Sequence, residues 1–220
     1  MVIIMTDNVK KTISFIKEKF ESVEEFRNDK YRYEHSLRVG AIGSRIAKAE
    51  CLDEEGLTIA CLLHDIGYIE CKTKEDYDTH GRISERIARV FLESLQFDKE
   101  RIESICYGIR IHTDNPIDIL RKPTPFELSV QTADNIDRFD AYRLYLNLQY
   151  SKLEGMSPKE IIECADSRIE RYTNYLDMDC GTKTGSDLWR DVLNYQIGYF
   201  KRIKEQMIIG EIMEQDGGIM

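Results

Sequence analysis

Residues 58–67, which read TIACLLHDIG, most constrain how this chain can fold. They predict an apolar helix that delivers His64 and Asp65 at its end and stops at Gly67, because glycine tolerates the left-handed backbone that often ends a helix. Neighbouring side chains on a helix point about 100° apart, so these two can share a centre only near a helix end. Imidazole and carboxylate together suit iron, manganese, zinc and similar ions. The alternative is a polar helix terminus, with Asp65 in solvent and His64 bonded to a nearby carbonyl.

The other histidines bear on this choice. The chain has four, each at or near the end of a predicted helix: His35, His64, His80 and His112. His35 falls in the first turns of a helix predicted over about residues 31–49, where it could also be a core histidine bonded to a carbonyl. Taken in order with Asp65 and Asp134, the polar residues read His, His-Asp, His, His, Asp.

His80 and His112 lie at opposite ends of two consecutive predicted helices. The first carries an apolar stripe, which comprises Ile83, Ile87, Val90, Phe91 and Leu95. Asp98 is expected to cap the second, which ends at His112 because Pro116 disfavours helix in the residue before it. If the short connection makes these helices antiparallel neighbours, both imidazoles lie on one side of the bundle.

Asp134 lies within a further predicted helix. Thr124-Pro125-Phe126-Glu127 predicts its start, with a threonine cap, proline at the first position and glutamate three residues after the cap. Arg138 follows Asp134 by one turn, so the two share a face. One interpretation is an ion pair within the helix. The other makes Asp134 a metal ligand and Arg138 a phosphate-binding cation, since a guanidinium fits phosphate oxygens.

This order of ligand types resembles the HD-domain superfamily of metal-dependent phosphohydrolases. The matching segments are YEHSLRV at 33–39, LLHDIG at 62–67 and TADN at 132–135. The resemblance covers about residues 30–140 and implies an all-α helical bundle whose metal is bound by four residues, His35, His64, Asp65 and Asp134. We expect one HD-type domain over residues 1–220, with additional C-terminal helices over about 141–210 packed on this core.

The resemblance also implies an enzyme that hydrolyses a small phosphorylated substrate, a nucleotide or phosphate ester, by metal-activated water. Asp65 would be catalytic, bridging ions or orienting the nucleophile. Branches with two further histidines, here His80 and His112, hold two metals. They include cyclic-nucleotide and cyclic-dinucleotide phosphodiesterases, dinucleoside-tetraphosphate hydrolases and some di-iron oxygenases. The Gly-Tyr-Pro signature of the cyclic-dinucleotide branch is missing, since Gly67-Tyr68 continues with Ile69.

We therefore expect one or two divalent transition-metal ions as cofactors: iron, manganese, zinc, cobalt or nickel, with iron or manganese favoured. Two alternatives stay open. One is a di-iron oxygenase on the same scaffold. The other is a protein that binds metal and nucleotide without turnover, although a complete ligand set argues against a degenerate site.

The charge composition limits the classes of binding partner expected for this chain. The net charge of -9 and the pI near 5.1 argue against binding to duplex nucleic acid or an anionic membrane, because phosphate backbones recruit basic surfaces. A locally positive pocket could still bind a small phosphorylated ligand. The charged stretch 66–79 contains Lys72 and Lys74, which are candidates to hold a phosphate or members of a solvated charge run.

The chain has no basic N-terminal region of a signal peptide, no apolar run long enough to span a membrane and no Cys-x-x-Cys pair. We expect a cytoplasmic protein with six reduced cysteines, of which Cys61 and Cys106 are buried. Seven of the twelve tyrosines lie beyond residue 141. Such tyrosines form a core or a homodimer contact, or a platform for base stacking.

Overall fold

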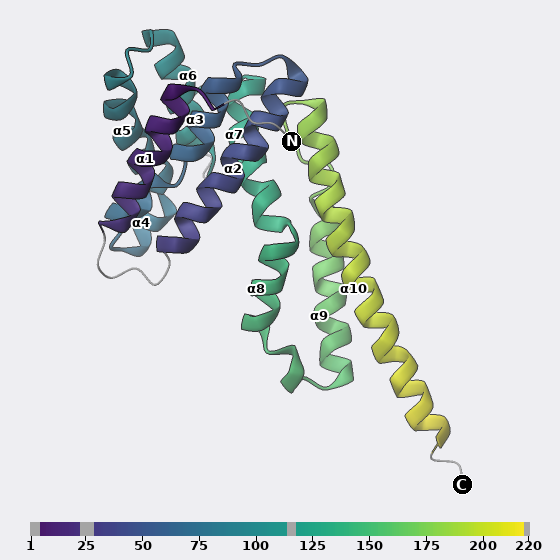
Figure 1. Ribbon diagram of the computed structural model, residues 1–220. Coiled ribbons are helices and arrows are strands. Elements are labelled where there is room, and N and C mark those ends of the chain that lie inside the picture. Colours follow the sequence, from purple (N-terminus) through teal and green to yellow (C-terminus); the bar gives the residue numbers. More distant parts are fainter. Residues whose placement is uncertain (1–4, 23–28, 114–117, 218–220) are drawn as a thin grey trace. The chain divides into compact units, whose positions relative to one another are not determined.

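The computed structural model describes residues 5–22, 29–113 and 118–217, and all regular structure in these ranges is helical (Figure 1). The expected all-α class is confirmed. In chain order the elements are α1 (Asp7–Glu21), α2 (Asp29–Glu50), α3 (Glu54–Leu63), the 3-10 helix η1 (Ile66–Glu70), α4 (Lys74–Asp78), α5 (His80–Ser94), α6 (Lys99–Ile111), α7 (Pro125–Phe139), α8 (Ala141–Ser151), the 3-10 helix η3 (Leu153–Gly155), α9 (Pro158–Asn174) and α10 (Lys183–Gly217).

The chain divides into two compact units, and each is described by itself. Unit 1 comprises Met1–Asp137 and Cys180–Ser186; unit 2 comprises Arg138–Asp179 and Asp187–Met220. The packing of the C-terminal helices on the motif core in one domain stays a prediction.

Side-chain caps start several helices of unit 1, and the sequence predicts the caps at Asp98 and Thr124. Asp53 accepts a hydrogen bond from the backbone N–H of Gly56, and Asp98 accepts one from Arg101. At the start of α7, Thr124 and Glu127 bond each other's backbone N–H reciprocally. Each cap satisfies amide groups that have no partner within their own helix.

Close packing of α2 on α3 depends on two small residues. A Cβ atom on Gly43 would lie 2.5 Å from the Cys61 sulfur, and one on Gly40 would lie 2.9 Å from Leu62. The two helices therefore approach backbone to backbone. This contact matters because α2 carries His35 and α3 ends beside His64.

The end of α3 differs from the prediction. The helix stops at Leu63 rather than at Gly67, and Gly67 lies inside η1 without a left-handed backbone. Its small size serves packing: a Cβ there would lie 2.6 Å from the His80 carbonyl oxygen, and its N–H donates to Ser84 Oγ at 2.8 Å. Gly67 thus lets η1 contact the start of α5.

The buried face of α5 also differs from the predicted apolar stripe. Val90 is 70% exposed, and the buried residues of this helix are Gly81, Ser84, Ala88 and Leu92. Small residues are needed on this face because a Cβ on Gly81 would lie 2.5 Å from the Arg110 carbonyl oxygen of α6. The predicted antiparallel neighbours α5 and α6 do pack together, and α6 ends at Ile111 with His112 as its cap. The segment containing Pro116 lies outside the described residues.

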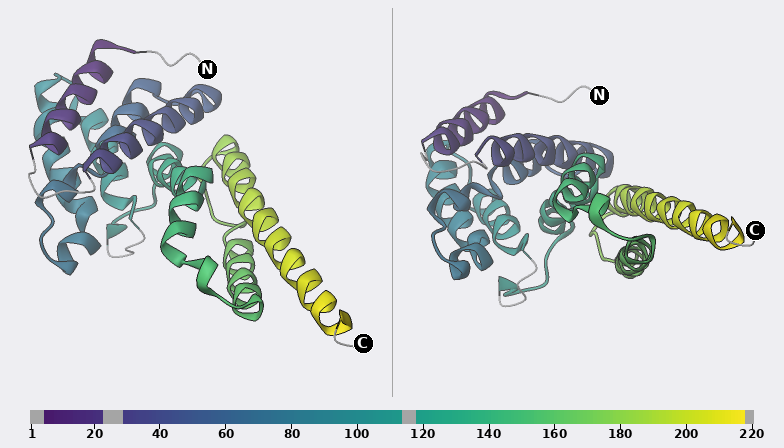
Figure 2. Two further views of the ribbon diagram at one scale, coloured as in Figure 1. Left: turned by 60° about the horizontal axis from the view of Figure 1, so that its bottom comes forward. Right: turned by 90° about the horizontal axis from the view of Figure 1, so that it is seen from below.

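In unit 2, α9 and α10 lie side by side, and α10 extends beyond the end of α9 (Figure 2). The Trp189 side chain is 1% exposed and its indole N–H donates to the Tyr175 carbonyl. Phe139 packs edge-on against Trp189. Tyr172 is also buried, whereas Tyr142, Tyr145, Tyr150 and Tyr195 are exposed, so the tyrosines beyond residue 141 contribute only in part to a core of this unit. None of the helices in the described ranges combines the length and apolar character needed to cross a bilayer.

Candidate metal centre

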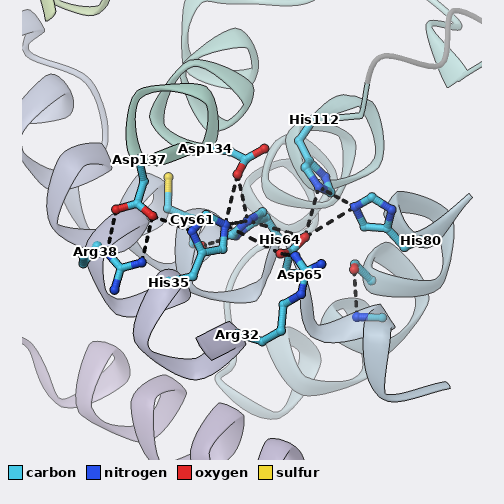
Figure 3. A network of polar contacts seen from close by, with 12 residues as sticks. Arg32, His35, Arg38, Cys61, His64, Asp65, His80, His112, Asp134 and Asp137 are labelled. Atoms are coloured by element: carbon cyan, nitrogen blue, oxygen red, sulfur yellow. Dashed lines mark hydrogen bonds and ion pairs between the residues drawn. The ribbon is translucent and has the colours of Figure 1, made fainter. Parts of the chain in front are cut away.

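Four histidines and two aspartates converge inside unit 1 (Figure 3). They come from α2 (His35), the segment after α3 (His64 and Asp65), the start of α5 (His80), the end of α6 (His112) and α7 (Asp134). All are buried except His80, whose side chain is 13% exposed. The structure therefore brings together all six residues that the sequence predicts as ligands.

Three of the imidazoles are oriented in the same way, by a hydrogen bond from Nδ1 to a backbone carbonyl oxygen. The Nδ1 atoms of His64, His80 and His112 lie 2.7, 2.7 and 2.5 Å from the carbonyl oxygen three residues earlier in the chain. A carbonyl can only accept, so each Nδ1 carries the proton and donates it. These carbonyls stand at helix ends, where they lack a partner within the helix. Helix termini thus orient the rings and turn each Nε2 toward the centre.

His35 lies within a helix and is oriented by a side chain instead. Its Nδ1 lies 2.7 Å from Asp137 Oδ2. Arg38 holds that carboxylate by donating from Nε to Oδ1 at 2.6 Å and from Nη2 to Oδ2 at 3.0 Å. The pKa of Asp137 is lowered because these bonds outweigh its burial. Asp137 therefore stays ionised and fixes the His35 ring.

The neutral form of each ring consequently presents an unprotonated Nε2 to the centre. A second bond at Nδ1 is how proteins orient histidines that bind metals, and it raises the basicity of the ligand. Four such nitrogens facing carboxylate oxygens leave lone pairs directed at one another. A cation between them removes this repulsion, so the donor set fits a bound metal.

The first group of donors consists of His35, His64 and Asp134. His35 Nε2 lies 3.2 Å from His64 Nε2 and 3.0 Å from Asp134 Oδ1, and His64 Nε2 lies 3.6 Å from that oxygen. Donors bound to one ion at about 2.1 Å are about 3.0 Å apart at right angles and about 3.4 Å apart at the tetrahedral angle. The three atoms are therefore spaced as ligands of a single ion.

The second group consists of His80, His112 and Asp65. His80 Nε2 lies 3.0 Å from His112 Nε2, and both lie close to Asp65 Oδ1, at 3.4 and 3.5 Å. His64 Nε2 is also 3.5 Å from Asp65 Oδ1. These spacings again match one ion.

Asp65 connects the two groups. Its Oδ1 faces His80 and His112, whereas its Oδ2 lies 3.6 Å from His35 Nε2 and accepts from Arg32 Nη1 at 2.6 Å. Burial opposes ionisation, but His64 and Arg32 hold the pKa of Asp65 well below its usual range. This carboxylate is therefore negatively charged and faces both groups of donors.

The first group attracts positive charge. Burial opposes a charge on His35, yet hydrogen bonds to Asp134 and Asp137 raise its pKa to about 9. The negative potential that binds this proton would equally bind a metal ion, and proton and metal compete for the same nitrogen.

The two residues predicted to bind substrate are both exposed. Lys72 is exposed, and its backbone N–H donates to Asp76 Oδ2 at 2.9 Å within the cap of α4. Arg138 is exposed and belongs to unit 2, whereas Asp134 belongs to unit 1. Phosphate binding by either residue stays a prediction.

Sequence reasoning missed the residues that support the ligands. Arg38 and Asp137 orient His35, and Arg32 bonds Asp65 while its guanidinium lies 3.6 Å above the Tyr68 ring. The spacing offered a signal: Arg32 and Arg38 lie three residues on either side of His35, and Asp137 lies three residues after Asp134. Residues three apart share a helix face.

Comparison with known protein families matches residues 32–142 to the HD domain. The match spans half of the chain and includes all six donors, so the chain belongs to the HD domain family, a superfamily of metal-dependent phosphohydrolases. Comparisons with curated proteins and with solved structures found no match.

Proposed function

We propose that this chain is a phosphohydrolase that uses two divalent transition-metal ions to hydrolyse a small phosphorylated substrate, a nucleotide or phosphate ester. One observation carries the proposal: six donor residues form two groups with ligand spacing, and the buried, ionised Asp65 faces both. Family membership supports metal-dependent hydrolysis in general. The number of ions and the class of substrate are part of the proposal.

The donors fit particular ions. His35, His64 and Asp134 would hold one ion, His80 and His112 the other, and Asp65 both. Imidazole favours iron, manganese, zinc, cobalt or nickel over magnesium. When bound, such ions lower the pKa of a water molecule and polarise a phosphoryl oxygen.

Residues of the chain then supply orientation and charge. Asp137 and the helix-end carbonyls keep the four Nε2 atoms directed inward. Arg32 holds the Asp65 carboxylate and is 26% exposed, so its guanidinium reaches from the carboxylate toward solvent. We propose that Arg32 is a further cation available to a phosphate oxygen, since guanidinium groups suit that geometry.

The thiol of Cys61, whose backbone carbonyl orients His64, is a poor nucleophile. Cys61 is fully buried, and burial raises the pKa of its thiol above the usual range. Because the thiolate is the reactive form, Cys61 is inert at neutral pH. This agrees with attack by water.

Metal analysis combined with hydrolysis assays tests the proposal. Wild-type protein should hold up to two metals per chain and hydrolyse at least one member of a panel of nucleotides and phosphate esters. Manganese, iron or cobalt should stimulate this activity and a chelator should abolish it. His112→Gln should lose one metal selectively, whereas His64→Ala or Asp134→Ala should lose metal from the first group.

Asp177→Asn, a change of an exposed aspartate in unit 2, serves as the control and should retain both metals. Unchanged metal content in His64→Ala and Asp134→Ala would contradict the site. If metal binds but no phosphorylated compound is hydrolysed, redox-dependent spectra of an iron-loaded sample would favour the di-iron oxygenase alternative.

A further inference from the structure

A pocket of about 530 Å³ lies within unit 2, lined by residues of α8 and α9. Its α9 side presents two guanidinium groups, Arg168 and Arg171, which share a helix face because they are three residues apart. Its α8 side presents Tyr150, whose side chain is 82% exposed. A pocket of this volume accommodates a small organic ligand.

Both arginines have neutral partners. Arg168 Nη1 lies 3.5 Å from the Tyr172 hydroxyl, its guanidinium lies 5.1 Å above the Phe200 ring, and Cys164 is a further hydrogen-bond partner. Arg171 Nε donates to the Tyr175 hydroxyl at 3.2 Å. No carboxylate pairs with either guanidinium among the described residues.

The arginines of unit 1 behave differently. Every one that makes a side-chain hydrogen bond within the described ranges bonds a carboxylate. Such pairing is expected in a chain with a net charge of -9. Arg168 is half-buried, whereas Arg171 is exposed. A partly buried cation without an anion, such as Arg168, carries a desolvation cost that a bound anion would offset. The positive charge in this pocket therefore favours the binding of an anionic ligand.

We propose that the pocket between α8 and α9 binds a phosphorylated small molecule. Arg168 and Arg171 bind the phosphate oxygens in charge-assisted hydrogen bonds. The Tyr150 ring offers a flat face to an aromatic portion of the ligand, such as a nucleobase. This site belongs to unit 2 and uses none of the metal ligands, so the inference does not rest on the proposed hydrolysis.

The half-buried Cys164, which lines the pocket, reports occupancy. The full-length, metal-loaded protein is treated with iodoacetamide, with or without a hydrolysis-resistant nucleotide, adenosine 5′-(α,β-methylene)diphosphate. Inorganic phosphate serves as a second probe. Peptide mass spectrometry follows the alkylation of Cys164 and, as an internal standard, of the exposed Cys51 in unit 1.

Saturating nucleotide should slow the alkylation of Cys164 several-fold and leave Cys51 unchanged. Arg168→Gln and the exposed Arg171→Gln should each raise the nucleotide concentration needed for protection by about tenfold, because each loses a charge-assisted bond to phosphate. Arg190→Gln, an exposed arginine of α10 in the same unit, should match wild type.

Protection by phosphate alone would support a site for the phosphate group itself, and stronger protection by the nucleotide would support the contact with Tyr150. The proposal is overturned if millimolar nucleotide leaves Cys164 alkylation unchanged in wild type, or if protection persists in both Arg168→Gln and Arg171→Gln. These outcomes are independent of metal content and turnover, so they separate this proposal from the proposed function.

Discussion

Asp137 is not one of the six donors, yet it orients one of them. It accepts from His35 Nδ1 at 2.7 Å and is held by Arg38. In Asp137→Asn the amide can still accept from His35, but the charge that increases the basicity of the ring and binds Arg38 is lost. We expect the affinity for the ion in the His35–His64–Asp134 group to fall about 10- to 100-fold. Competition titration against a colorimetric chelator measures this change.

The same titration follows the His80–His112 group, whose rings are oriented by backbone carbonyls that this substitution does not touch. Asp177→Asn should leave both affinities at the wild-type values. Equal weakening of both ions in Asp137→Asn would mean that the variant is misfolded. Full affinity in both would show that His35 needs no orienting carboxylate.

For individual residues, the sequence predicts the metal donors better than the residues that orient them. The order of four histidines and two aspartates along the chain, through its resemblance to the HD-domain superfamily, selects His35, His64, His80 and His112. Asp137 and Arg38 read as ordinary charged positions on helices, because the contact between them joins residues 99 apart in the chain. Their pairing depends on how α2 meets α7, which periodicity within one helix does not specify.

Among the helices, the α2–α3 contact positions His35 against His64. In Gly43→Ala the added methyl group would meet Cys61, which lies in the buried core. Overpacking of this kind costs about 1–3 kcal/mol, more than the ~0.5–1 kcal/mol that alanine gains over glycine inside a helix. We expect a lower free energy of unfolding, measured by urea denaturation in excess chelator.

Gly198→Ala in α10 is the matched control, since nothing lies within 4 Å of a Cβ atom there. It should raise the free energy of unfolding slightly, by helix propensity alone. A Gly43→Ala variant as stable as wild type would show that the two helices can separate without cost.

The ion pair and cap made by Glu127 at the start of α7 predict that the free energy of unfolding depends on pH. Glu127 is 1% exposed; burial opposes its ionisation, but Arg121 and Thr124 lower its pKa. A lowered pKa in the folded state contributes stability above the ordinary value of about 4.3 and loses it as the pH falls through the folded value. Glu127→Gln should therefore cost about 1–2 kcal/mol near pH 7, and the difference from wild type should shrink in acid.

Urea denaturation between pH 7 and pH 3 measures this difference. Glu160→Gln changes the equivalent residue of the exposed cap of α9 and should cost less, because solvent screens the charge. A cost for Glu127→Gln that is independent of pH would show that shape rather than charge matters at this position.

Capping residues and periodicity predict where several helices start, as Asp98 and Thr124 show. They predict buried faces less well. On α5 the close contact with η1 and α6 selects small residues for burial and leaves Val90 exposed. Gly67 acts through the same close packing rather than through a left-handed turn. The buried face of α5 and the role of Gly67 both depend on the distances between neighbouring helices, and tertiary structure sets those distances.

For the molecule as a whole, the metal donors and the proposed anion pocket lie in different compact units.

The C-terminal part of α10 carries exposed apolar side chains, including Ile209 at 62% and Met213 at 69%. Homodimer formation stays a prediction, which light scattering of the purified protein can measure.

The division into units also predicts how the chain responds to metal removal. All six donors belong to unit 1, and an ion that binds the folded state alone stabilises it by about 2.7 kcal/mol at a hundredfold excess over its Kd. A chelator should therefore accelerate amide hydrogen exchange in α2, α3, α5 and α6, while exchange in α9 and α10 should stay near its metal-loaded rate. His112→Gln, which should keep the first group of ligands, should show a smaller acceleration on chelation. If α9 and α10 accelerate as much as the metal-bearing helices, the two units unfold together, and the C-terminal helices are then energetically part of a single domain.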